Sequence, residues 1–571
     1  MLMLERASES RSFLTAAFLY FILTTVIKYA IIKIKNKGDK HMKVVNILNF
    51  LRGCEPRETE IHQALDFWLQ KGRIEAHEID ENKDNYSWKY TKMQEILFET
   101  AKMQLEAVNE MKLPATFLMQ YDTLCDSRYV SLFREAGQRV EVGLWFEVVK
   151  PLAEACGIPY ESANGWSWDW HIRPGFLPGY LPSDRERLID EAMRKFKEVY
   201  GYYPKSVGSW LLDTHSACYM SDNYGVHAFC ICRDQVSTDA YTLIGGYFNQ
   251  GYFPSRNNIF TPAKSAELTL KTPVFRMLSP DPIHNYDSNK YVSAGSEMPV
   301  YTMEALGPAG MSRANTDWFF KTYFVNEDMG FSYSHIGQEN SFCMFDLVST
   351  MKMHAERAGL IPDVQFMTLS EMGDAFTKLY GNTTPATSVC ALDNWDTEDC
   401  QSVYYDCKSY TANIFRHKNR IFIRALYLFD EKAEDYYIRE ICHSFDGVYE
   451  NQPVVDTVRK SGENAEWMLD TEGAPLSVRK LFEGELEVFW DDKSVIFRED
   501  GIELKNLSIS LATDSALGSP EVSVKDGKID YTYRSRGYGV RVLNGSIAEN
   551  DGKYSLFSDN GSFSLSFWVE D

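Results

Sequence analysis

Polar side chains follow short apolar segments at several places in this chain, and the clearest case is residues 207–216. This segment starts as an apolar run typical of a buried parallel strand and ends in a polar cluster with Asp213 and Ser216. On spacing alone, Asp213 is typical of an N-cap for a helix that begins near His215. In a parallel barrel, however, side chains that follow the strands gather at one rim, where catalysis takes place. Because other predicted strands also end in acids, amides or Trp, we expect Asp213 to be catalytic.

Paired carboxyl groups at such a rim are suited to the cleavage of a glycosidic bond. One group must be protonated to assist departure of the leaving group, and the other must be ionised. Burial and a neighbouring carboxylate raise the pKa of one group, which divides the roles. We predict Glu339 as the acid, because the amides Gln338 and Asn340 flank it, and Asp234 as its substitute. A structural salt bridge accounts for Glu339 equally well. The carboxylates that follow predicted strands are Glu55, Glu147, Asp213, Asp234, Asp281 and Glu339.

Charged and aromatic side chains near the same strand ends are candidates for substrate binding. Arg52, Glu55 and Arg57 form a charged group that could hold a sugar carboxylate, and a buried ion pair is the structural alternative. The Trp-rich loop 165–171 could form a wall that stacks on sugar rings, or a core aromatic cluster. Its His171 is a candidate metal ligand or general acid, although a lone histidine is more often a satisfied hydrogen-bonding residue. The predicted substrate-binding residues are Arg52, Glu55, Gln120, Trp145, Glu147, Trp168, Trp170, His171, Trp210, Tyr247, Gln250, Gln338 and Asn340.

The elements that must position these side chains alternate between strands and helices. The helix at 182–200 is the best marked, with Ser183 expected as its cap and apolar residues at helical spacing. Strands alternating with helices predict an α/β fold, a (β/α)7-type barrel over residues 42–380. Further helices are expected at 93–111 and 215–224, and strands at 43–50, 114–122, 139–147, 207–212, 226–232, 273–278, 331–340 and 364–369.

The pattern changes from about residue 381, where short alternating segments replace the helices. The turn signals Asp526-Gly527, Asn544-Gly545 and Asp551-Gly552 separate segments of period two. Residues 381–571 are therefore predicted to form an all-β, sandwich-like domain.

The first 41 residues allow more than one interpretation. Residues 13–32 are apolar apart from Lys28, which is long enough for a membrane anchor if Lys28 snorkels. The four lysines from Lys33 to Lys40 would then leave the active domain in the cytoplasm. A secretory signal fits poorly, because no small-residue cleavage site follows. Alternatively Met42 is the native start, since the codons for residues 37–41 can form a bacterial ribosome-binding site, and the protein is cytoplasmic.

Composition narrows the classes of function. The net charge of −22 excludes a nucleic-acid partner, whose phosphates require a basic face. The aromatic share of 14% suits carbohydrate binding, because ring faces stack on the apolar side of a pyranose. The 11 cysteines include no spacing typical of zinc, so free thiols are expected. No cofactor and no metal site are predicted.

The first three predicted strands resemble those of NodB-type polysaccharide deacetylases. The family's acidic "TFDDG" strand is similar to residues 44–58. Its "KATFF" strand is similar to residues 112–118, and its "HEIGNHT" strand to residues 141–147. The metal ligands of the family are missing, because Cys54-Glu55 stands in place of the Asp pair, and Glu147 lies in the region of the His-x-x-x-His. This resemblance implies a seven-stranded barrel.

Residues 207–216 are similar to the "GWxxDPFGHS" motif of family 38 α-mannosidases. Gly208, Trp210, Asp213 and Ser216 occupy its positions, and the resemblance implies that Asp213 is the nucleophile. The first-strand His-x-Asp zinc pair of that family is absent. Family 57 hydrolases share the barrel, work without metal and carry a β-rich C-terminal region. Together the resemblances cover about residues 42–380.

Three hypotheses follow from these observations. The first is a glycoside hydrolase that uses paired carboxylates without metal on a small glycoside or oligosaccharide. The second is a metal-dependent carbohydrate deacetylase, in which a metal-bound water attacks an acetamide. The third is a non-catalytic carbohydrate-binding protein built on a degenerate barrel.

Overall fold

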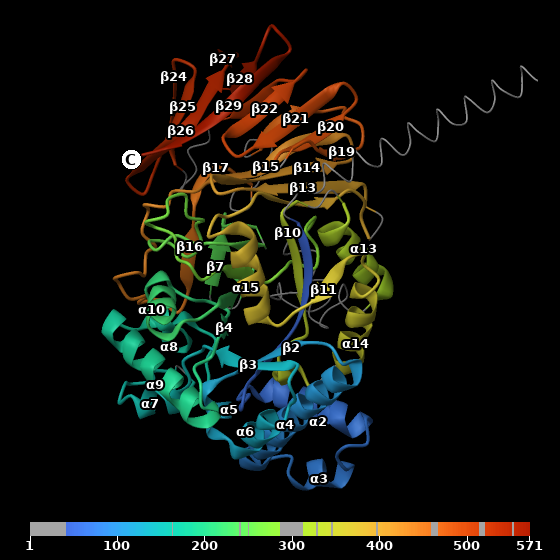
Figure 1. The fold of residues 1–571 in the computed structure, drawn as a ribbon, viewed down its shortest axis with the longest axis vertical. Helices are drawn as coiled ribbons and strands as arrows, with labels where there is room; N and C mark the ends of the chain where they lie inside the picture. Colours follow the sequence, from blue (N-terminus) through green and yellow to red (C-terminus); the bar gives the residue numbers. More distant parts are fainter. Residues whose placement is uncertain are drawn as a thin grey trace, which may run out of the picture. The chain divides into compact units, whose positions relative to one another are not determined.

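Parallel strands alternate with helices along residues 42–380 of the computed structural model (Figure 1). The predicted anchor at 13–32 and the predicted turn at 551–552 lie outside the described residues. Among the helices that are described, none is long and apolar enough to cross a membrane. The structure describes residues 41–570 except 163, 239–240, 249, 286–311, 327–328, 344–346, 396–397, 458–465, 483, 513–519 and 551–552.

Seven parallel strands of the described chain make up most of the first sheet. In sheet order they are β10 (Phe331–Ile336), β1 (Met42–Leu51), β2 (Ala115–Met119), β3 (Val140–Trp145), β4 (Ser206–Ser209), β5 (Ala228–Ile231) and β9 (Val274–Arg276). The short strand β8 (Gly251–Tyr252) pairs antiparallel with β9, and β11 (Val364–Phe366) pairs with β1.

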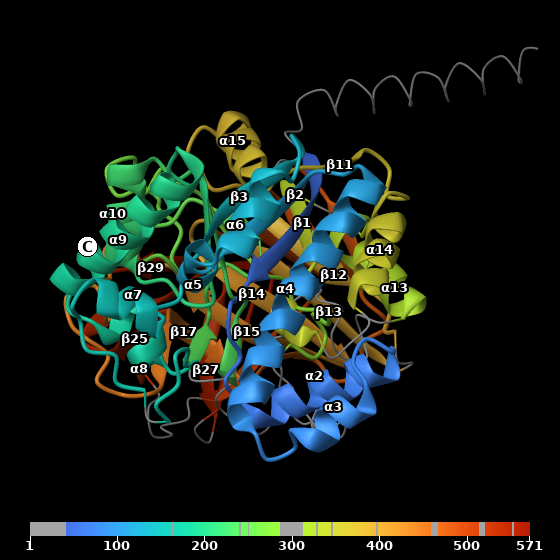
Figure 2. The same ribbon diagram turned by 90° about the horizontal axis from the view of Figure 1, so that it is seen from below.

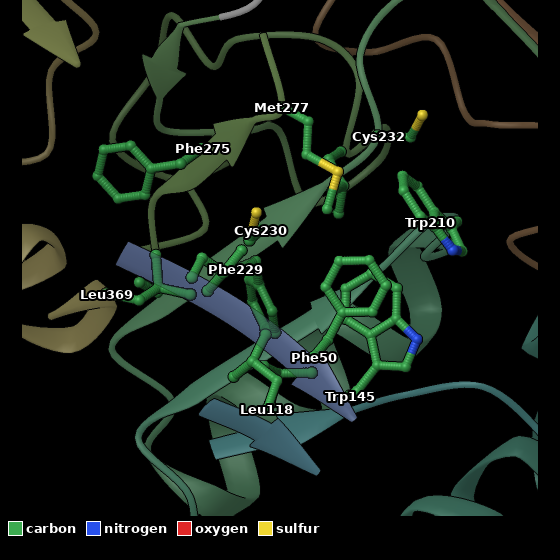
Figure 3. Packing of buried hydrophobic residues seen from close by; sticks show 14 of the residues in the cluster. Phe50, Leu118, Trp145, Trp210, Phe229, Cys230, Cys232, Phe275, Met277 and Leu369 are labelled. Atoms are coloured by element: carbon green, nitrogen blue, oxygen red, sulfur yellow. The ribbon is translucent and has the colours of Figure 1, made fainter. Parts of the chain in front are cut away.

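Side chains connect the two ends of this series of strands. The ring centroid of Phe275 on β9 lies 6.0 Å from that of Phe331 and 5.3 Å from that of Tyr333, both on β10. The sheet is therefore a nearly closed barrel, and the predicted fold class is confirmed. The interior is apolar near the rim, where Phe50, Leu118, Trp145 and Trp210 pack together (Figure 3).

Helices surround the barrel strands (Figure 2). They are α2 (Glu58–Gln70), α3 (Ala76–Glu81), α4 (Tyr86–Met111), α5 (Tyr121–Cys125), α6 (Ser127–Arg134), α7 (Lys150–Ala155), α8 (Ile172–Gly175), α9 (Pro182–Tyr200), α10 (Thr214–Tyr224), α13 (Arg313–Phe324), α14 (Leu347–Ala358) and α15 (Leu369–Tyr380), with 3₁₀ turns η1 (Leu177–Gly179) and η2 (Asn340–Phe342).

Helix α9 has the predicted bounds but not the predicted cap. It buries Leu188, Ala192 and Phe196 at helical spacing. Its N-cap position is Leu181, which makes no capping side-chain hydrogen bond, so the assignment of Ser183 as the cap is wrong. Pro182 begins the helix instead, because its ring fixes φ in the helical range and it lacks an N–H that would need a partner there.

The chain after residue 381 forms strands that pair almost entirely antiparallel, so the predicted all-β region is confirmed. Asp526 and Gly527 both have positive φ, 52° and 74°, as a type I′ hairpin requires. The strands are β12 (Thr387–Ala391), β13 (Cys400–Asp406), β14 (Tyr410–His417), β15 (Arg420–Leu428), β16 (Gly447–Glu450), β17 (Gln452–Asp456), β18 (Trp467–Asp470), β19 (Ser477–Lys480), β20 (Leu486–Trp490), β21 (Lys493–Arg498), β22 (Gly501–Lys505), β23 (Ile509–Ala512), β24 (Glu521–Lys525), β25 (Lys528–Tyr533), β26 (Arg536–Leu543), β27 (Ser546–Asn550), β28 (Lys553–Phe557) and β29 (Ser562–Val569).

Apart from β16, these strands form two sheets that share one apolar core, and β17 pairs with β15 beside the first of them. One sheet has the order β12-β13-β14-β15-β18-β23-β28-β27, and the other β19-β20-β21-β22-β29-β26-β25-β24. Tyr405 on β13 stacks on Phe497 on β21, with 5.2 Å between ring centroids, so the sheets face one another as in a sandwich.

The β region is joined to the barrel through the segments that follow β5. Strand β16 pairs in parallel with β7 (Tyr241–Ile244), which in turn pairs with β6 (Gln235–Thr238). The ring of Phe248 stacks on Tyr404, with 3.6 Å between centroids, and its N–H donates to Asp406 Oδ1 (2.8 Å). The predicted boundary near residue 381 falls between α15 and β12.

Candidate active site at the strand ends

Four neighbouring strands bring their carboxyl ends to the same part of the barrel rim. Arg52 follows β1, Gln120 follows β2, Glu147 follows β3 and Glu339 follows β10. The sheet order β10-β1-β2-β3 makes these strands adjacent, although β10 lies far from the others in sequence. All four side chains are buried, with at most 2% of any residue exposed. We call them the rim cluster.

Glu147 is the most extensively hydrogen-bonded member of the rim cluster. Arg52 donates to it twice, from Nη2 to Oε1 (2.7 Å) and from Nε to Oε2 (3.1 Å). Gln120 Nε2 (2.5 Å) and Trp168 Nε1 (2.9 Å) donate to the same Oε2. A carboxylate accepts all four bonds, so these donors orient Glu147 and stabilise its charge.

Glu339 shares the same guanidinium but occupies a different electrostatic environment. Arg52 donates to Glu339 Oε2 from Nη1. Burial raises the pKa of Glu339 to about 7, because Arg52 offsets the loss of solvation only in part and the nearby charge of Glu147 raises the pKa further. Near neutral pH, Glu339 is therefore able both to hold a proton and to release one.

The amides that flank Glu339 have different environments. Asn340 Oδ1 accepts from the backbone N–H of Arg52 (2.8 Å), and Asn340 Nδ2 donates to the Arg52 carbonyl (3.0 Å). Asn340 thus fixes the backbone of Arg52. Gln338 is also buried, and its Oε1 has no hydrogen-bond partner among the described residues.

A second ion pair and the Trp-rich loop lie beside the rim cluster. Arg57 donates to Glu55 from Nε and Nη2 (both 2.8 Å), so the predicted charged group exists as two separate networks. The guanidinium of Arg52 lies 4.1 Å from the centroid of Trp168, and that of Arg57 lies 5.3 Å from Trp170. The two arginines therefore hold the tryptophans at the barrel mouth.

His171 belongs to the same loop but is tied to Asp169. Its Nδ1 lies 2.6 Å from Asp169 Oδ1, and its ring stacks on Trp170 with 5.1 Å between centroids. Its side chain is 27% exposed, so it lies nearer the surface than the rim cluster.

An open groove of about 600 Å³ begins at the Trp-rich loop. Tyr86, Tyr90, Trp166 and Ser167 line it, together with Lys150. Ser167 directly precedes Trp168, whose Nε1 donates to Glu147, so the lining of the groove is adjacent in sequence to a hydrogen-bond donor of the rim cluster.

Asp213 follows β4 as the N-cap of α10, and other groups of the protein donate hydrogen bonds to both of its carboxylate oxygens. Its Oδ1 accepts from Ser216 N (3.0 Å) and from Arg185 Nη1 (3.0 Å), and its Oδ2 accepts from Ser216 Oγ (2.6 Å). Arg185 also donates to the carbonyls of Tyr437 (2.5 Å) and Glu440 (2.8 Å) in the β region. Asp213 thus caps α10 and links the barrel to the β region. Its predicted role as nucleophile stays a prediction.

Other predicted acids also hold loops and strands together. Asp234 accepts from Arg276 Nη2 (2.7 Å) and from the backbone N–H of Gly245 (3.0 Å). Asp281 accepts from Trp395 Nε1 (2.8 Å). No hydrogen bond or ion pair described in the structure joins either residue to the rim cluster.

The remaining predicted substrate-binding residues lie in the core. Trp145 stacks on Phe50 with 4.1 Å between centroids, and Trp210 meets Trp145 edge-on at 5.5 Å (Figure 3). A Cβ on Gly208 would lie 2.8 Å from the Trp145 ring, which explains the glycine. Tyr247 donates to the Pro385 carbonyl (2.5 Å), and Gln250 Oε1 is buried without a partner among the described residues.

Sequence reasoning missed two features of the rim. Arg52 was expected to bind substrate or pair with Glu55, whereas it joins Glu147 to Glu339. Asp122 was not among the predicted site residues, whereas its half-buried carboxylate accepts from Gly53 N (3.1 Å) and Thr123 N (2.7 Å). Burial raises the pKa of Asp122 to about 6. The signal in the sequence was its position two residues after Gln120 at the same strand end.

The described residues do not supply an evident metal site. No group of three or more His, Cys, Asp or Glu side chains converges among them as ligands would. In the rim cluster, Arg52 provides the positive charge between the two carboxyl groups.

Comparisons with known proteins give structural neighbours only. No protein-family model and no curated protein matches this sequence. One similar structure is described as a glycoside hydrolase/deacetylase from Parabacteroides distasonis, with 14% identity, 75% of this chain and 94% of that chain covered, and a TM-score of 0.48. A polysaccharide deacetylase from Mycobacterium smegmatis has 11% identity, 60% and 92% coverage and a TM-score of 0.33. PuuE allantoinase has 10% identity, 60% and 93% coverage and a TM-score of 0.33.

Two of these neighbours are thus described as a glycoside hydrolase/deacetylase and a polysaccharide deacetylase, and the third as an allantoinase. With TM-scores below 0.5, no conclusion about the reaction of this chain rests on them.

Proposed function

We propose that this chain hydrolyses a carbohydrate, with Glu339 as general acid and Glu147 as its ionised partner. The observation that carries the proposal is that two carboxyl groups share the Arg52 guanidinium in unlike environments. Glu147 accepts four N–H donors, whereas burial raises the pKa of Glu339 to about 7. Paired acids in unlike environments are what hydrolysis of a glycosidic bond requires.

The proposed reaction uses the rim cluster as follows. Protonated Glu339 donates to the oxygen of the leaving group as the glycosidic bond breaks. The carboxylate that results stays paired with Arg52, which stabilises the charge that develops on it. Glu147 faces the positive charge that develops on the sugar, and either attacks it or activates a water molecule. The separation of the two carboxyl groups across the bound sugar decides between these outcomes.

Substrate must pass the Trp-rich loop to reach these groups. Glu147 and Glu339 are 1% and 2% exposed, and Trp168 donates to Glu147. The groove lined by Tyr86, Tyr90 and Trp166 offers ring faces for sugars next to this loop. In this proposal substrate binds first in the groove, and displacement of Trp168 opens the rim cluster.

A non-catalytic carbohydrate-binding protein is the second candidate. The deep burial of both carboxyl groups favours it, because a buried ion-pair network has the same appearance. A metal-dependent deacetylase has less support, since the described residues offer no converging ligand set.

Product analysis on the full chain separates the three candidates. Aryl glycosides and acetylated oligosaccharides are incubated with the protein, with and without a chelator. Release of reducing sugar that persists with chelator and is lost in Glu147→Gln and Glu339→Gln supports the proposal. Acetate release that the chelator abolishes would favour the deacetylase, and binding without any product would favour the binding protein.

A further inference from the structure

His171 is held by a buried carboxylate at the mouth of the barrel. Asp169 is fully buried, and its Oδ1 lies 2.6 Å from His171 Nδ1 and accepts from the backbone N–H of His171 (3.1 Å). Its Oδ2 accepts from Ser162 Oγ (2.8 Å). These contacts orient Asp169, and a carboxylate that only accepts hydrogen bonds places the ring proton of a neutral His171 on Nδ1. We call this pair the Asp169–His171 dyad.

The packing of the imidazole ring leaves Nε2 open to solvent. Trp170 stacks on the ring with 5.1 Å between centroids, and Phe445 approaches it edge-on at 5.2 Å, yet the His171 side chain is 27% exposed. Among the described residues no group bonds to Nε2, and Nε2 is not one of the buried polar atoms without a partner. In the tautomer set by Asp169, Nε2 can therefore accept a hydrogen bond from another molecule.

The backbone that carries the dyad is attached to the chain that follows β3. Val148 N–H donates to the Gly175 carbonyl (2.8 Å), and Gly175 N–H donates to the His171 carbonyl (2.9 Å). Val148 directly follows Glu147 in the sequence. His171 is thus held at the same strand end as Glu147 of the rim cluster.

Another histidine–aspartate pair of the barrel shows what distinguishes the dyad. His227 Nδ1 lies 2.8 Å from Asp374 Oδ1, and the His227 side chain is 33% exposed. The Asp374 side chain is 63% exposed, so water screens this pair and competes for both partners. His227 also precedes β5, at the end of the barrel opposite the rim. Of the two pairs, the dyad alone combines a buried carboxylate with a place beside the rim cluster.

Two tryptophans connect the rim cluster with the dyad. Trp168 Nε1 donates to Glu147, and the ring centroid of Trp168 lies 6.2 Å from that of Trp170. Trp170 in turn stacks on His171. Glu147 is buried and His171 is partly exposed, so a ligand that touches both extends past these rings and is longer than one sugar ring.

We propose that His171 Nε2 accepts a hydrogen bond from a hydroxyl group of the substrate, and that this contact selects neutral oligosaccharides over single sugars. The inference rests on the proposed function, because it takes the ligand of the rim cluster to be a carbohydrate. While one sugar lies at the rim cluster, the next one reaches the mouth and donates to Nε2. A neutral sugar suits the mouth, because Arg57 beside Trp170 already donates twice to Glu55 and offers an acidic sugar no uncompensated cation.

Calorimetric titration of the full chain with short S-linked oligosaccharides of neutral sugars, which resist hydrolysis, tests this inference. His171→Asn keeps an N–H that can donate to Asp169 but has no group in the place of Nε2, so the affinity should fall about 3- to 10-fold. His171→Gln places an amide near the position of Nε2 and should recover most of the affinity. His227→Asn is the matched control, because it alters a histidine–aspartate pair far from the rim, and it should leave the affinity unchanged.

The corresponding monosaccharides separate a binding role from a loss of structure. Their affinity should be equal in His171→Asn and the wild type, whereas an equal fall for monosaccharides and oligosaccharides would show damage to the fold and overturn the inference. Equal oligosaccharide affinity in His171→Asn and the wild type would also overturn it, as would an equal loss in His227→Asn or the absence of oligosaccharide binding.

Hydrolysis of aryl glycosides by the wild type shows which of the two proposals has failed. If the wild type hydrolyses them while His171→Asn binds oligosaccharides normally, the inference fails and the proposed function stands. If oligosaccharide binding follows the prediction while no glycoside is hydrolysed, the proposed hydrolysis fails and His171 remains a carbohydrate-binding residue.

Discussion

Arg52 and Glu147 form a doubly hydrogen-bonded ion pair across β2, with Nη2–Oε1 at 2.7 Å and Nε–Oε2 at 3.1 Å. The same guanidinium donates to Glu339 at the end of β10. One cation thus holds together Glu147 and Glu339, which are 192 positions apart in the sequence.

Removing this cation should destabilise the fold strongly. Arg52→Met leaves two buried carboxyl groups without their cation, so we expect a loss of about 3–5 kcal/mol in the free energy of unfolding. Urea unfolding measures it. Arg194→Met is the control, because Arg194 pairs with Glu191 and Glu198 on the exposed face of α9 and should cost less than about 1 kcal/mol. Similar losses in both variants would contradict this account of the rim cluster.

The stability of the protein should depend on pH through Glu339. Its pKa is raised from 4.5 to about 7 on folding, so the folded state binds a proton that the unfolded state releases between these values. The contribution of Glu339 to stability is fully present below pH 4.5 and is lost as the pH rises through about 7. Urea unfolding from pH 4 to 8 should therefore show a smaller fall for Glu339→Gln than for the wild type. Parallel profiles would mean that Glu339 titrates normally.

The two roles considered for Asp213 lead to opposite results. Asp213→Asn keeps an oxygen that can accept from Ser216 N but weakens the pair with Arg185, so stability should fall while turnover per folded molecule is kept. Circular dichroism and activity on the same sample measure both. A folded Asp213→Asn variant without turnover would support the nucleophile role and remove that role from Glu147.

The pattern of apolar residues predicted most of the fold. Strand β1 and helices α9 and α10 lie within two residues of their expected bounds, because hydrophobic periodicity depends on the local chain. The cap of α9 was missed, since Pro182 and Ser183 are both common in the first turn.

The site could be predicted only in part. The sequence indicated that three of the residues follow strands, namely Gln120, Glu147 and Glu339. The carboxyl ends of the strands in a parallel barrel meet at one rim. Which of them touch depends on the sheet order, in which β10 pairs with β1, and on Arg52 reaching across β2. The contacts that tie Asp213 to Arg185, and Arg185 to Tyr437, cross from the barrel to the β region, and no local pattern records them.

The claim that Glu339 is the general acid has the most direct test. Once an active aryl glycoside is known, kcat/KM is compared for a phenyl and a dinitrophenyl glycoside of that sugar. A phenyl leaving group needs a proton, so Glu339→Gln should lower its kcat/KM by about 10²- to 10⁴-fold, whereas the dinitrophenyl substrate should lose far less. Glu141→Gln, at the other end of β3, is the control and should change neither value. Equal losses on both substrates, or no loss on either, would contradict the assignment of Glu339 as the acid.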